Sequence, residues 1–163
     1  MIVKLKNKDT LIVDKFKLKC CIGKKGISKN KYEGDYTTPY GKYILGKLYW
    51  RSDREKKPIT KLICKKINKN MVWCNDSKSS HYNREVKKNK KIKYEKIYRK
   101  DFKYNYFILI KYNYFKPKKN KGSAIFIHLT KNYKPTAGCI ALSKKDFLIF
   151  AKKVNKNTSI LIN

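Results

Sequence analysis

The chain has 163 residues, which is enough for one domain of ordinary size and too few for two. Hydrophobic residues make up 41% of it, a share that excludes an intrinsically disordered chain and allows a real core. Its 43 basic and 11 acidic residues give a formal net charge of +32, so weak, salt-sensitive binding to any polyanion is expected.

The origin of this charge has two interpretations. An anionic partner such as nucleic acid, an acidic membrane surface or an anionic wall polymer would explain it. Codon bias would explain it too, because Lys, Asn, Ile and Tyr are all abundant here and all have AT-rich codons. The lysines are spread along the whole chain, and arginine, the better ligand for phosphate, is scarce. This even spread favours codon bias.

The N-terminal half predicts strands separated by one long loop. The first residues, MIVKLKNKDTLIVDKF, contain no apolar run as long as that of a signal peptide or a membrane span. Residues Thr10 to Ile22 are apolar with partial alternation and predict one or two strands. A loop rich in Gly, Asn and Asp follows from Gly23 to Gly41, and strand character returns at Lys42 to Trp50 and at Thr60 to Ile67.

The C-terminal half predicts more strands and the one clear helix. Turn-forming residues are frequent from Asn68 to Val86, so this segment is predicted to be mostly irregular. The strand predictions, which rest on aromatic and β-branched content, are Tyr104 to Tyr112, Ser123 to Leu129 and Thr158 to Ile162. A helix is expected over Ser143 to Val154, with Ser143 as its N-cap. Residues 1–163 are therefore expected to form a single, mainly β domain, a barrel or sandwich with one short helix.

The five cysteines do not form a metal-binding pattern. There is no C-x-x-C and there are only two histidines, so no zinc site is expected. The odd number leaves at least one thiol free unless it pairs between chains. Adjacent Cys20 and Cys21 are expected to be buried, on opposite faces of a strand. The disulfide state of these two, and of Cys64 and Cys74, stays open.

A histidine and the last cysteine carry the candidate chemistry. Ten residues separate His128, at the end of a predicted strand, from Cys139 in the run PTAGC. A cysteine nucleophile needs an imidazole that takes its proton, and backbone N–H groups that bind the oxyanion. Gly138 suits this second need because it lets the backbone approach a substrate closely. The alternative is that Cys139 is a small buried core residue and His128 a satisfied core histidine.

Several segments resemble the YkuD-like L,D-transpeptidases of bacterial cell-wall synthesis. The run GSAIFIHLTKNYKPTAGCIALSKKDF (Gly122 to Phe147) is similar to the catalytic signature of that family. Three upstream segments are similar to other family motifs, in the right order: KYEGDYTTPYGKY from Lys31, MVWCNDSKSSHYNREV from Met71 and IKYNYF from Ile110. The resemblance extends over most of the chain, from about Gly23 to Ile162.

The resemblance implies roles for particular residues. Cys139 would be the nucleophile, His128 the general base, and the backbone carbonyl of Leu129 the group that orients the imidazole. The backbone N–H groups of Gly138 and Cys139 would form the oxyanion hole. Further residues would line the donor groove, namely Thr136, Tyr82, Asn83 and Trp73, although core aromatics and a turn-forming hydroxyl are the alternatives for them.

Two departures from the family pattern concern substrate recognition. Many members carry His or Arg where this chain has Ala137, and Arg or Asn where it has Ala141. Recognition of the donor carboxylates would then fall to other groups, for which the lysines are candidates. The resemblance implies no metal and no organic cofactor, and we expect a monomer.

The implied reaction is acyl transfer on peptidoglycan tetrapeptide stems, with either an amine or water as acceptor. Such a substrate places the enzyme in the cell envelope or periplasm, although no export signal is visible. A basic non-catalytic binding protein for nucleic acid or an anionic cell-wall surface is the main alternative, since lysines alternate with aromatics from Tyr94 to Phe115. A wall-binding domain whose activity has lapsed is a third reading, because of Ala137 and Ala141.

Overall fold

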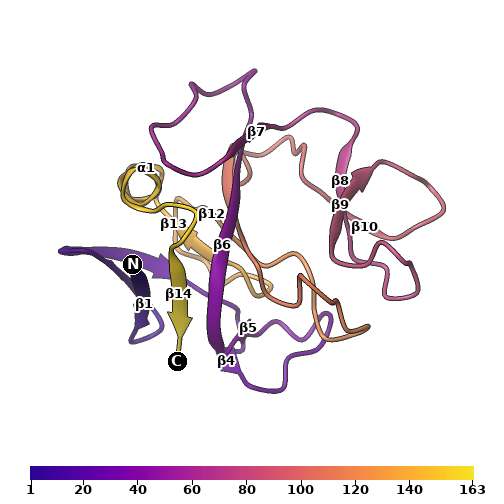
Figure 1. Ribbon diagram of the computed structural model, residues 1–163, viewed down its shortest axis with the longest axis horizontal. Coiled ribbons are helices and arrows are strands. Elements are labelled where there is room, and N and C mark those ends of the chain that lie inside the picture. Colours follow the sequence, from indigo (N-terminus) through magenta and orange to yellow (C-terminus); the bar gives the residue numbers. More distant parts are fainter.

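The computed structural model describes residues 1–163 and contains fourteen strands and one helix (Figure 1). In chain order these are β1 (Ile2–Lys6), β2 (Thr10–Val13), β3 (Phe16–Cys21), β4 (Ile27–Ser28), β5 (Thr38–Pro39), β6 (Gly41–Trp50), β7 (Cys64–Lys66), β8 (Met71–Cys74), β9 (Arg84–Lys87), β10 (Tyr94–Lys96), β11 (Tyr106–Ile110), β12 (Phe126–Leu129), β13 (Ile140–Leu142), α1 (Lys144–Lys153) and β14 (Ser159–Ile162). The predicted mainly β fold with one helix after the cysteine is confirmed.

The large sheet closes on itself and forms a mixed barrel. Its strand order is β11-β12-β13-β3-β2-β1-β14-β6-β7, and an added pairing of β11 with β6 closes the ring, with β7 outside it. Three pairs are parallel, β1 with β14, β12 with β13 and β6 with β7, and the others are antiparallel. Closure leaves few unpaired strand edges on the barrel.

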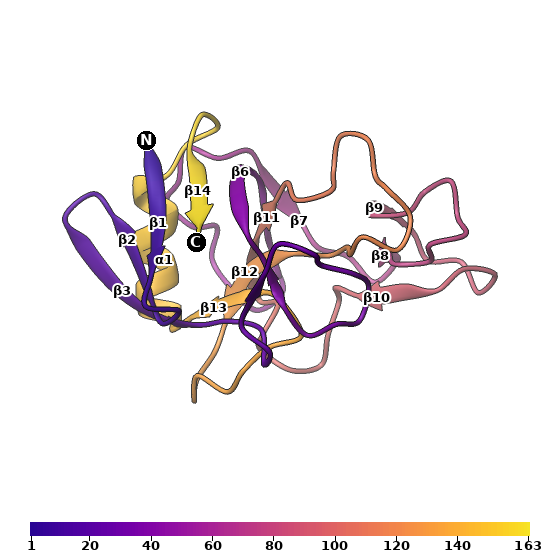
Figure 2. The ribbon, with the colours of Figure 1, turned by 90° about the horizontal axis from the view of Figure 1, so that it is seen from below.

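Side-chain alternation along the barrel strands divides the core into two clusters. On β11, Ile108 and Ile110 belong to the cluster inside the barrel, whereas Phe107 and Leu109 belong to a second cluster. The second cluster lies between the barrel and a three-stranded sheet with the order β10-β8-β9. Seen from below, this small sheet and helix α1 lie toward opposite ends of the molecule (Figure 2).

Aromatic contacts join the small sheet to the barrel. The ring of Trp73 on β8 meets Phe126 of β12 edge to face, with centroids 5.0 Å apart. The same Trp73 ring also meets Tyr49 of β6 edge to face, with centroids 6.5 Å apart. Each such pair adds about 0.5–1.5 kcal/mol beyond its area burial. The small sheet is thus a fixed second layer, and it covers the barrel strands that carry the candidate catalytic residues.

Helix α1 begins and ends with the expected local chemistry. The Ser143 hydroxyl accepts a hydrogen bond from the Asp146 N–H at 3.1 Å, which confirms the predicted N-cap. Phe147, Phe150 and Ala151 of the helix are buried in the barrel cluster. With ten residues and several charges, the helix is too short and too polar to cross a bilayer.

Most predicted strands are confirmed, but some short strands were not predicted. Thr10 to Ile22 contains the two strands β2 and β3, and the aromatic run before Tyr112 contains β11. The segment Asn68 to Val86 was expected to be mostly irregular, and most of it is, but it also contains β8 and part of β9. All four residues of β8 are buried because β9 and β10 flank it on both sides. The turn formers that misled the prediction lie in the connection between β8 and β9.

Candidate active site

The two candidate catalytic residues lie on neighbouring strands and on the same face. His128 on β12 pairs with Ala141 on β13, in parallel register. Cys139 comes directly before β13 and therefore lies beside Phe126, one two-residue step from His128. Because successive side chains alternate, both point away from the barrel interior toward the small sheet. Cys139 accordingly belongs to the second core cluster.

The thiol of Cys139 is buried and bonded to backbone groups. Its Sγ donates to the carbonyl of Ala124 at 3.2 Å and accepts from the N–H of Phe126 at 3.3 Å. Burial raises the pKa of this thiol to about 12. The thiol makes no hydrogen bond to His128. At neutral pH the structure therefore holds a protonated thiol that is bonded to the backbone and not to the imidazole.

The imidazole of His128 is held by the group that the resemblance implied. Its Nδ1 lies 2.9 Å from the carbonyl oxygen of Leu129, the geometry of a bond in which Nδ1–H is the donor. That tautomer leaves Nε2 with a free lone pair, as a general base requires. Burial lowers the pKa of His128 to about 4, so the ring is neutral at pH 7.

The side chain of Tyr104 contacts His128 and approaches Cys139. Its ring lies 5.3 Å from the imidazole and 5.8 Å from Phe126, both edge to face. Its hydroxyl donates to Glu95, which is its hydrogen-bond partner from β10. Burial raises the pKa of this carboxyl. The nearby Tyr104 hydroxyl also acts to lower the pKa of the Cys139 thiol, although burial outweighs it.

Gly138 occupies a backbone position that other residues would strain. Its φ is +142°, and a Cβ there would stand 2.7 Å from the carbonyl oxygen of Thr37. The Gly138 N–H donates to the Thr136 hydroxyl at 3.1 Å, and that hydroxyl donates to the Cys139 carbonyl at 2.5 Å. The N–H of Cys139 makes no hydrogen bond in the structure. Of the two expected oxyanion donors, one is thus free and one is engaged by Thr136.

A buried ion pair lies behind the Gly138 turn. Lys31 donates to Asp35 and to the Thr37 carbonyl, each at 2.7 Å. Burial opposes ionisation of Asp35, but the bonds from Lys31 and Thr37 outweigh it and lower its pKa to about 2. The Lys31 Nζ lies 3.3 Å from the position a Gly138 Cβ would take. A positive charge therefore stands close to Gly138, and it acts to lower the Cys139 pKa.

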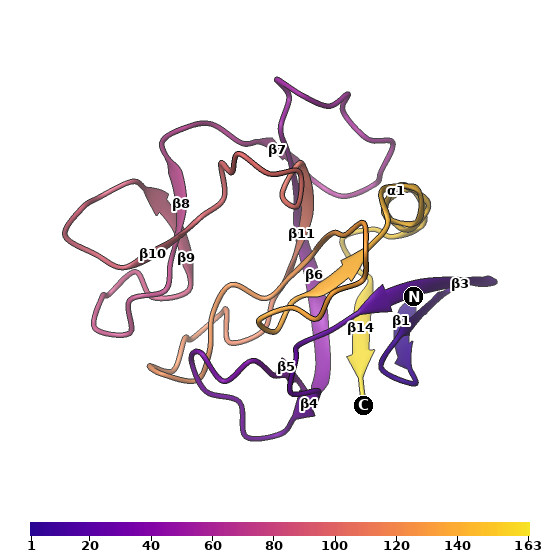
Figure 3. The ribbon, with the colours of Figure 1, turned by 180° about the vertical axis from the view of Figure 1, so that it is seen from behind.

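A cavity of about 490 Å³ opens beside His128. Its lining includes four cationic side chains, Arg99, Lys103, Lys131 and Lys134, and also both alanines that depart from the family pattern. Cys139 itself does not line it, whereas Thr136 does, as expected. The cavity can accept an anionic ligand, and its cations are suited to carboxylates. Figure 3 shows the ribbon from behind, with the small sheet of β8, β9 and β10 on one side of the barrel and helix α1 on the other.

Three residues expected to line the groove are instead structural. Trp73, Tyr82 and Asn83 are almost fully buried, and none of them reaches the cavity. The Asn83 side chain accepts from the indole N–H of Trp73 at 2.9 Å and from the Ala124 N–H at 3.1 Å. The Tyr82 hydroxyl donates to Glu33. These bonds clamp the small sheet to the barrel, which explains the burial and corrects the expectation.

Sequence reasoning missed Lys31, Glu95 and Tyr104. Each comes from a segment far from Cys139, and no local spacing connects them to it. One signal was present, since Glu95 is an isolated acidic residue in a lysine- and tyrosine-rich stretch of a strongly basic chain. An acid kept in such surroundings indicates a specific partner, and here that partner is the hydroxyl of Tyr104.

Comparisons with known proteins show the family and agree with the fold. The family described as the YkuD L,D-transpeptidase catalytic domain matches residues 2–162. Two solved structures of the helical cell shape determining protein Pgp2 from Campylobacter jejuni, one of them a point mutant, are similar in fold. Their TM-scores are 0.52 and 0.50, with 18% identity over 98% of this chain. The chain spans 45% and 46% of those two chains, and no curated protein matches it.

Proposed function

The chain belongs to the YkuD family of L,D-transpeptidase catalytic domains, and on that premise we propose that it is a cysteine-dependent L,D-transpeptidase acting on peptidoglycan tetrapeptide stems. The family is one of cell-wall enzymes with a cysteine nucleophile. One observation carries the proposal for this chain: Cys139 and His128 share one face of two adjacent strands, and the Nδ1 of His128 is bound to Leu129. This arrangement supports a single site in which the thiol of Cys139 has a neutral imidazole as its base, with Nε2 free to take the proton.

In the first half-reaction, Sγ of Cys139 gives its proton to Nε2 of His128 and attacks a peptide carbonyl. The attacked bond joins the third, L-centred residue to the terminal D-alanine. The tetrahedral intermediate collapses when the amine of D-alanine takes the proton from His128 and leaves. A thioester between the stem and Cys139 remains.

The oxyanion of the tetrahedral intermediate needs donors that do not reorganise during the step. The free N–H of Cys139 meets this condition. The N–H of Gly138 is the second donor once substrate binding has released it from the Thr136 hydroxyl, before the chemical step. The charge of Lys31 beside Gly138 adds electrostatic stabilisation to the same oxygen. Asp35, which pairs with Lys31 at 2.7 Å, offsets part of this effect.

The reaction also requires a local movement. The thiol has to turn from the Ala124 carbonyl toward Nε2 of His128, and Tyr104 stands in contact with that ring. Substrate in the cavity beside His128 would displace the Tyr104 side chain or use its hydroxyl as a donor. The pKa of about 12 then describes the resting thiol, and proton transfer to His128 occurs within the bound complex.

In the second half-reaction, His128 takes a proton from the acceptor as the acceptor attacks the thioester. An amine from a second stem gives a 3→3 cross-link, and another amine gives attachment of that acceptor. Water gives an L,D-carboxypeptidase reaction instead. Collapse of the intermediate returns the proton to Cys139. The balance between these outcomes depends on access of amine and water to the same thioester.

We propose further that residues 1–163 act as one catalytic domain in the cell envelope, where peptidoglycan lies. The support for one domain is the closed barrel, in which the first strand, β1, pairs with the last, β14. The four cations beside His128 are the proposed recognition groups for the donor carboxylates, in place of the side chains missing at Ala137 and Ala141.

The decisive experiment is intact-protein mass spectrometry after incubation with a carbapenem, a class that acylates this family. We expect a single covalent adduct on the wild type and none on Cys139→Ala. Cys64→Ala is the matched control, because Cys64 is the most exposed of the other cysteines and its loss should leave the adduct in place. A folded wild type without an adduct, or an adduct that survives in Cys139→Ala, would contradict the proposal. A stem-peptide assay then separates the two acceptors.

A further inference from the structure

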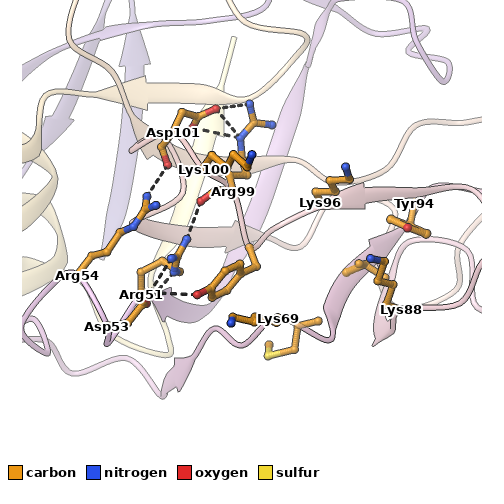
Figure 4. Close-up of a pocket in the computed structure, with 13 residues that line it drawn as sticks. Arg51, Asp53, Arg54, Lys69, Lys88, Tyr94, Lys96, Arg99, Lys100 and Asp101 are labelled. Carbon is orange, nitrogen blue, oxygen red and sulfur yellow. Dashed lines mark hydrogen bonds and ion pairs between the residues drawn. The ribbon is translucent and has the colours of Figure 1, made fainter.

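A second and larger cavity, of about 930 Å³, lies on the other side of the segment 94–101 (Figure 4). Arginine is scarce in this chain, yet three of its four arginines line this groove. With them are four lysines, two tyrosines and two aspartates: the lining includes Arg51, Arg54, Arg99, Lys69, Lys88, Lys96, Lys100, Tyr94, Tyr98, Asp53 and Asp101. We call this feature the cationic groove. It brings together seven of the 43 basic residues of the chain.

The arginines of the cationic groove mainly build its wall. The guanidinium of Arg51 donates to both carboxylate oxygens of Asp53 and, at 2.6 Å, to the carbonyl of Arg99. It also stacks on the ring of Tyr98, 3.6 Å from the centroid. Arg99 in turn pairs with Asp101 at 2.6 Å. Figure 4 shows these bonds as one connected network. Both aspartates of the groove are thus paired with arginines.

The lysines of the cationic groove have no such partners. Lys69, Lys88, Lys96 and Lys100 are all exposed, and none of them forms an ion pair. They come from three separate parts of the chain, around β8, after β9 and around β10. Four uncompensated ammonium groups around one concave surface favour an anionic ligand.

The cationic groove and the cavity beside His128 share a wall. Along β10, Tyr94 and Lys96 face the groove, whereas Glu95 between them faces the His128 cavity. Arg99 lines both. A polymer with anionic groups at intervals can therefore occupy both sites at once by passing around the end of this wall. Tyr98 offers little to a nucleic-acid base, because Arg51 covers one face of its ring and its hydroxyl is bonded to Asp53.

We propose that the cationic groove binds the carboxylates of a second peptide stem of the same peptidoglycan polymer, while the first stem occupies the His128 cavity. This inference rests on the proposed function for the identity of the polymer. Peptidoglycan repeats carboxylate-bearing stems along its strands, so a bound neighbouring stem raises the effective concentration of the reacting one. The groove then acts as a retention site for the polymer and takes no part in the chemistry.

The test measures binding without catalysis, in the Cys139→Ala background. Purified insoluble peptidoglycan is the probe, and the bound fraction is measured by co-sedimentation at several salt concentrations. The test variant carries Lys→Gln changes at Lys69, Lys88, Lys96 and Lys100. The matched control carries the same changes at Lys4, Lys6, Lys15 and Lys17, which are equally exposed and lie on the strands β1 to β3 or between them, away from the small sheet (Figure 2). Both variants lose the same charge, and thermal melting checks that both are folded.

We expect the groove variant to bind roughly tenfold more weakly than the control, as four exposed ion pairs of ordinary strength would give. The difference should vanish on peptidoglycan whose carboxylates have been converted to amides. Equal weakening in the two variants would overturn the proposal in favour of bulk charge. The proposal would also be overturned if the groove variant still bound more weakly than the control on the amidated polymer, or if it did so on DNA and not on peptidoglycan. The two proposals can fail separately. If the groove variant binds intact peptidoglycan more weakly than the control, but the wild type forms no carbapenem adduct, the retention site is supported and the proposed transpeptidase reaction is contradicted.

Discussion

At the scale of single residues, Cys139 lies under the influence of two opposite buried charges. Lys31 acts to lower the pKa of the thiol, and the carboxyl of Glu95 acts to raise it. Burial itself raises the pKa more than either. The resting thiol is thus protected from oxidants and alkylating agents, because only the thiolate reacts. Activation of the thiol then depends on how bound substrate changes the effects of Lys31 and Glu95 on its pKa.

Replacement of Lys31 by Met should slow alkylation of Cys139 by iodoacetamide at pH 8, because loss of the cation raises the thiol pKa further. A change of one pKa unit corresponds to about tenfold in rate. Asp35→Asn is the paired variant, since it removes the anion that neutralises Lys31. It should speed alkylation. If the ion pair is only structural, both variants will change the rate in the same direction, and that result would remove Lys31 from the proposed mechanism.

Burial of His128 makes stability depend on pH. Its pKa is about 4 in the folded protein against an ordinary 6.5, so below pH 6.5 the unfolded chain binds a proton that the folded one does not. The neutral imidazole therefore contributes stability that is complete above pH 6.5 and is lost as pH falls toward 4. The loss should be on the order of 3 kcal/mol, measured by urea unfolding at a series of pH values.

The control for this effect is His128→Gln, which cannot be protonated in that range. Its free energy of unfolding should fall less steeply between pH 6.5 and 4 than that of the wild type. Asp35 does not interfere, because its pKa of about 2 places its own loss of stability at lower pH. Identical pH profiles for the two proteins would mean that the imidazole is accessible to solvent.

How far the sequence predicted the site depends on whether a residue has a local signature. Cys139 and His128 could be found because their chemistry and motif lie within one short run. The hydrogen bond between Nδ1 of His128 and the carbonyl of Leu129 was expected from the family resemblance of the same run. Lys31 and Tyr104 could not, because they reach the thiol through tertiary contacts that no spacing records. For Trp73, expected in the donor groove with a core aromatic as the alternative, burial against Phe126 favours the alternative.

At the scale of elements, the small sheet β10-β8-β9 is the part that local patterns predicted least well. Its strands have three or four residues each, and lysines and turn formers surround them. They are strands because they pair with one another and because Trp73 and Ile97 pack on the barrel. Long strands such as β6 and β11 were predictable because their own aliphatic and aromatic content was sufficient.

Helix α1 offers a test of local capping. Ser143→Ala removes the acceptor for the Asp146 N–H and should lower the free energy of unfolding by about 1 kcal/mol. Chemical denaturation of both proteins measures the difference. Ser143→Asp keeps an acceptor at the cap and is the control, with stability close to that of the wild type. A loss of similar size in both variants would assign the effect to packing at this position.

At the scale of the whole molecule, the net charge of +32 opposes compaction. The six ion pairs of the structure neutralise only a small part of it. Stability should therefore rise as salt screens the lysines, since the Debye length falls from about 30 Å at 0.01 M to about 8 Å at 0.15 M. Urea unfolding at increasing NaCl concentration measures this, because urea carries no charge. A free energy of unfolding that falls with salt would show that the ion pairs outweigh the repulsion.

The pairing of β1 with β14 has a consequence for how the chain acquires its structure. Register places Val3 opposite Ile160, and β14 lies between β1 and β6 in the barrel. On the ribosome, β1 and β6 are made early, and both lack the strand that joins them until residues 159–162 have emerged. Contacts this distant in sequence make folding slow. Until then two open strand edges are exposed to other chains, so the nascent protein should depend on chaperones that cover them.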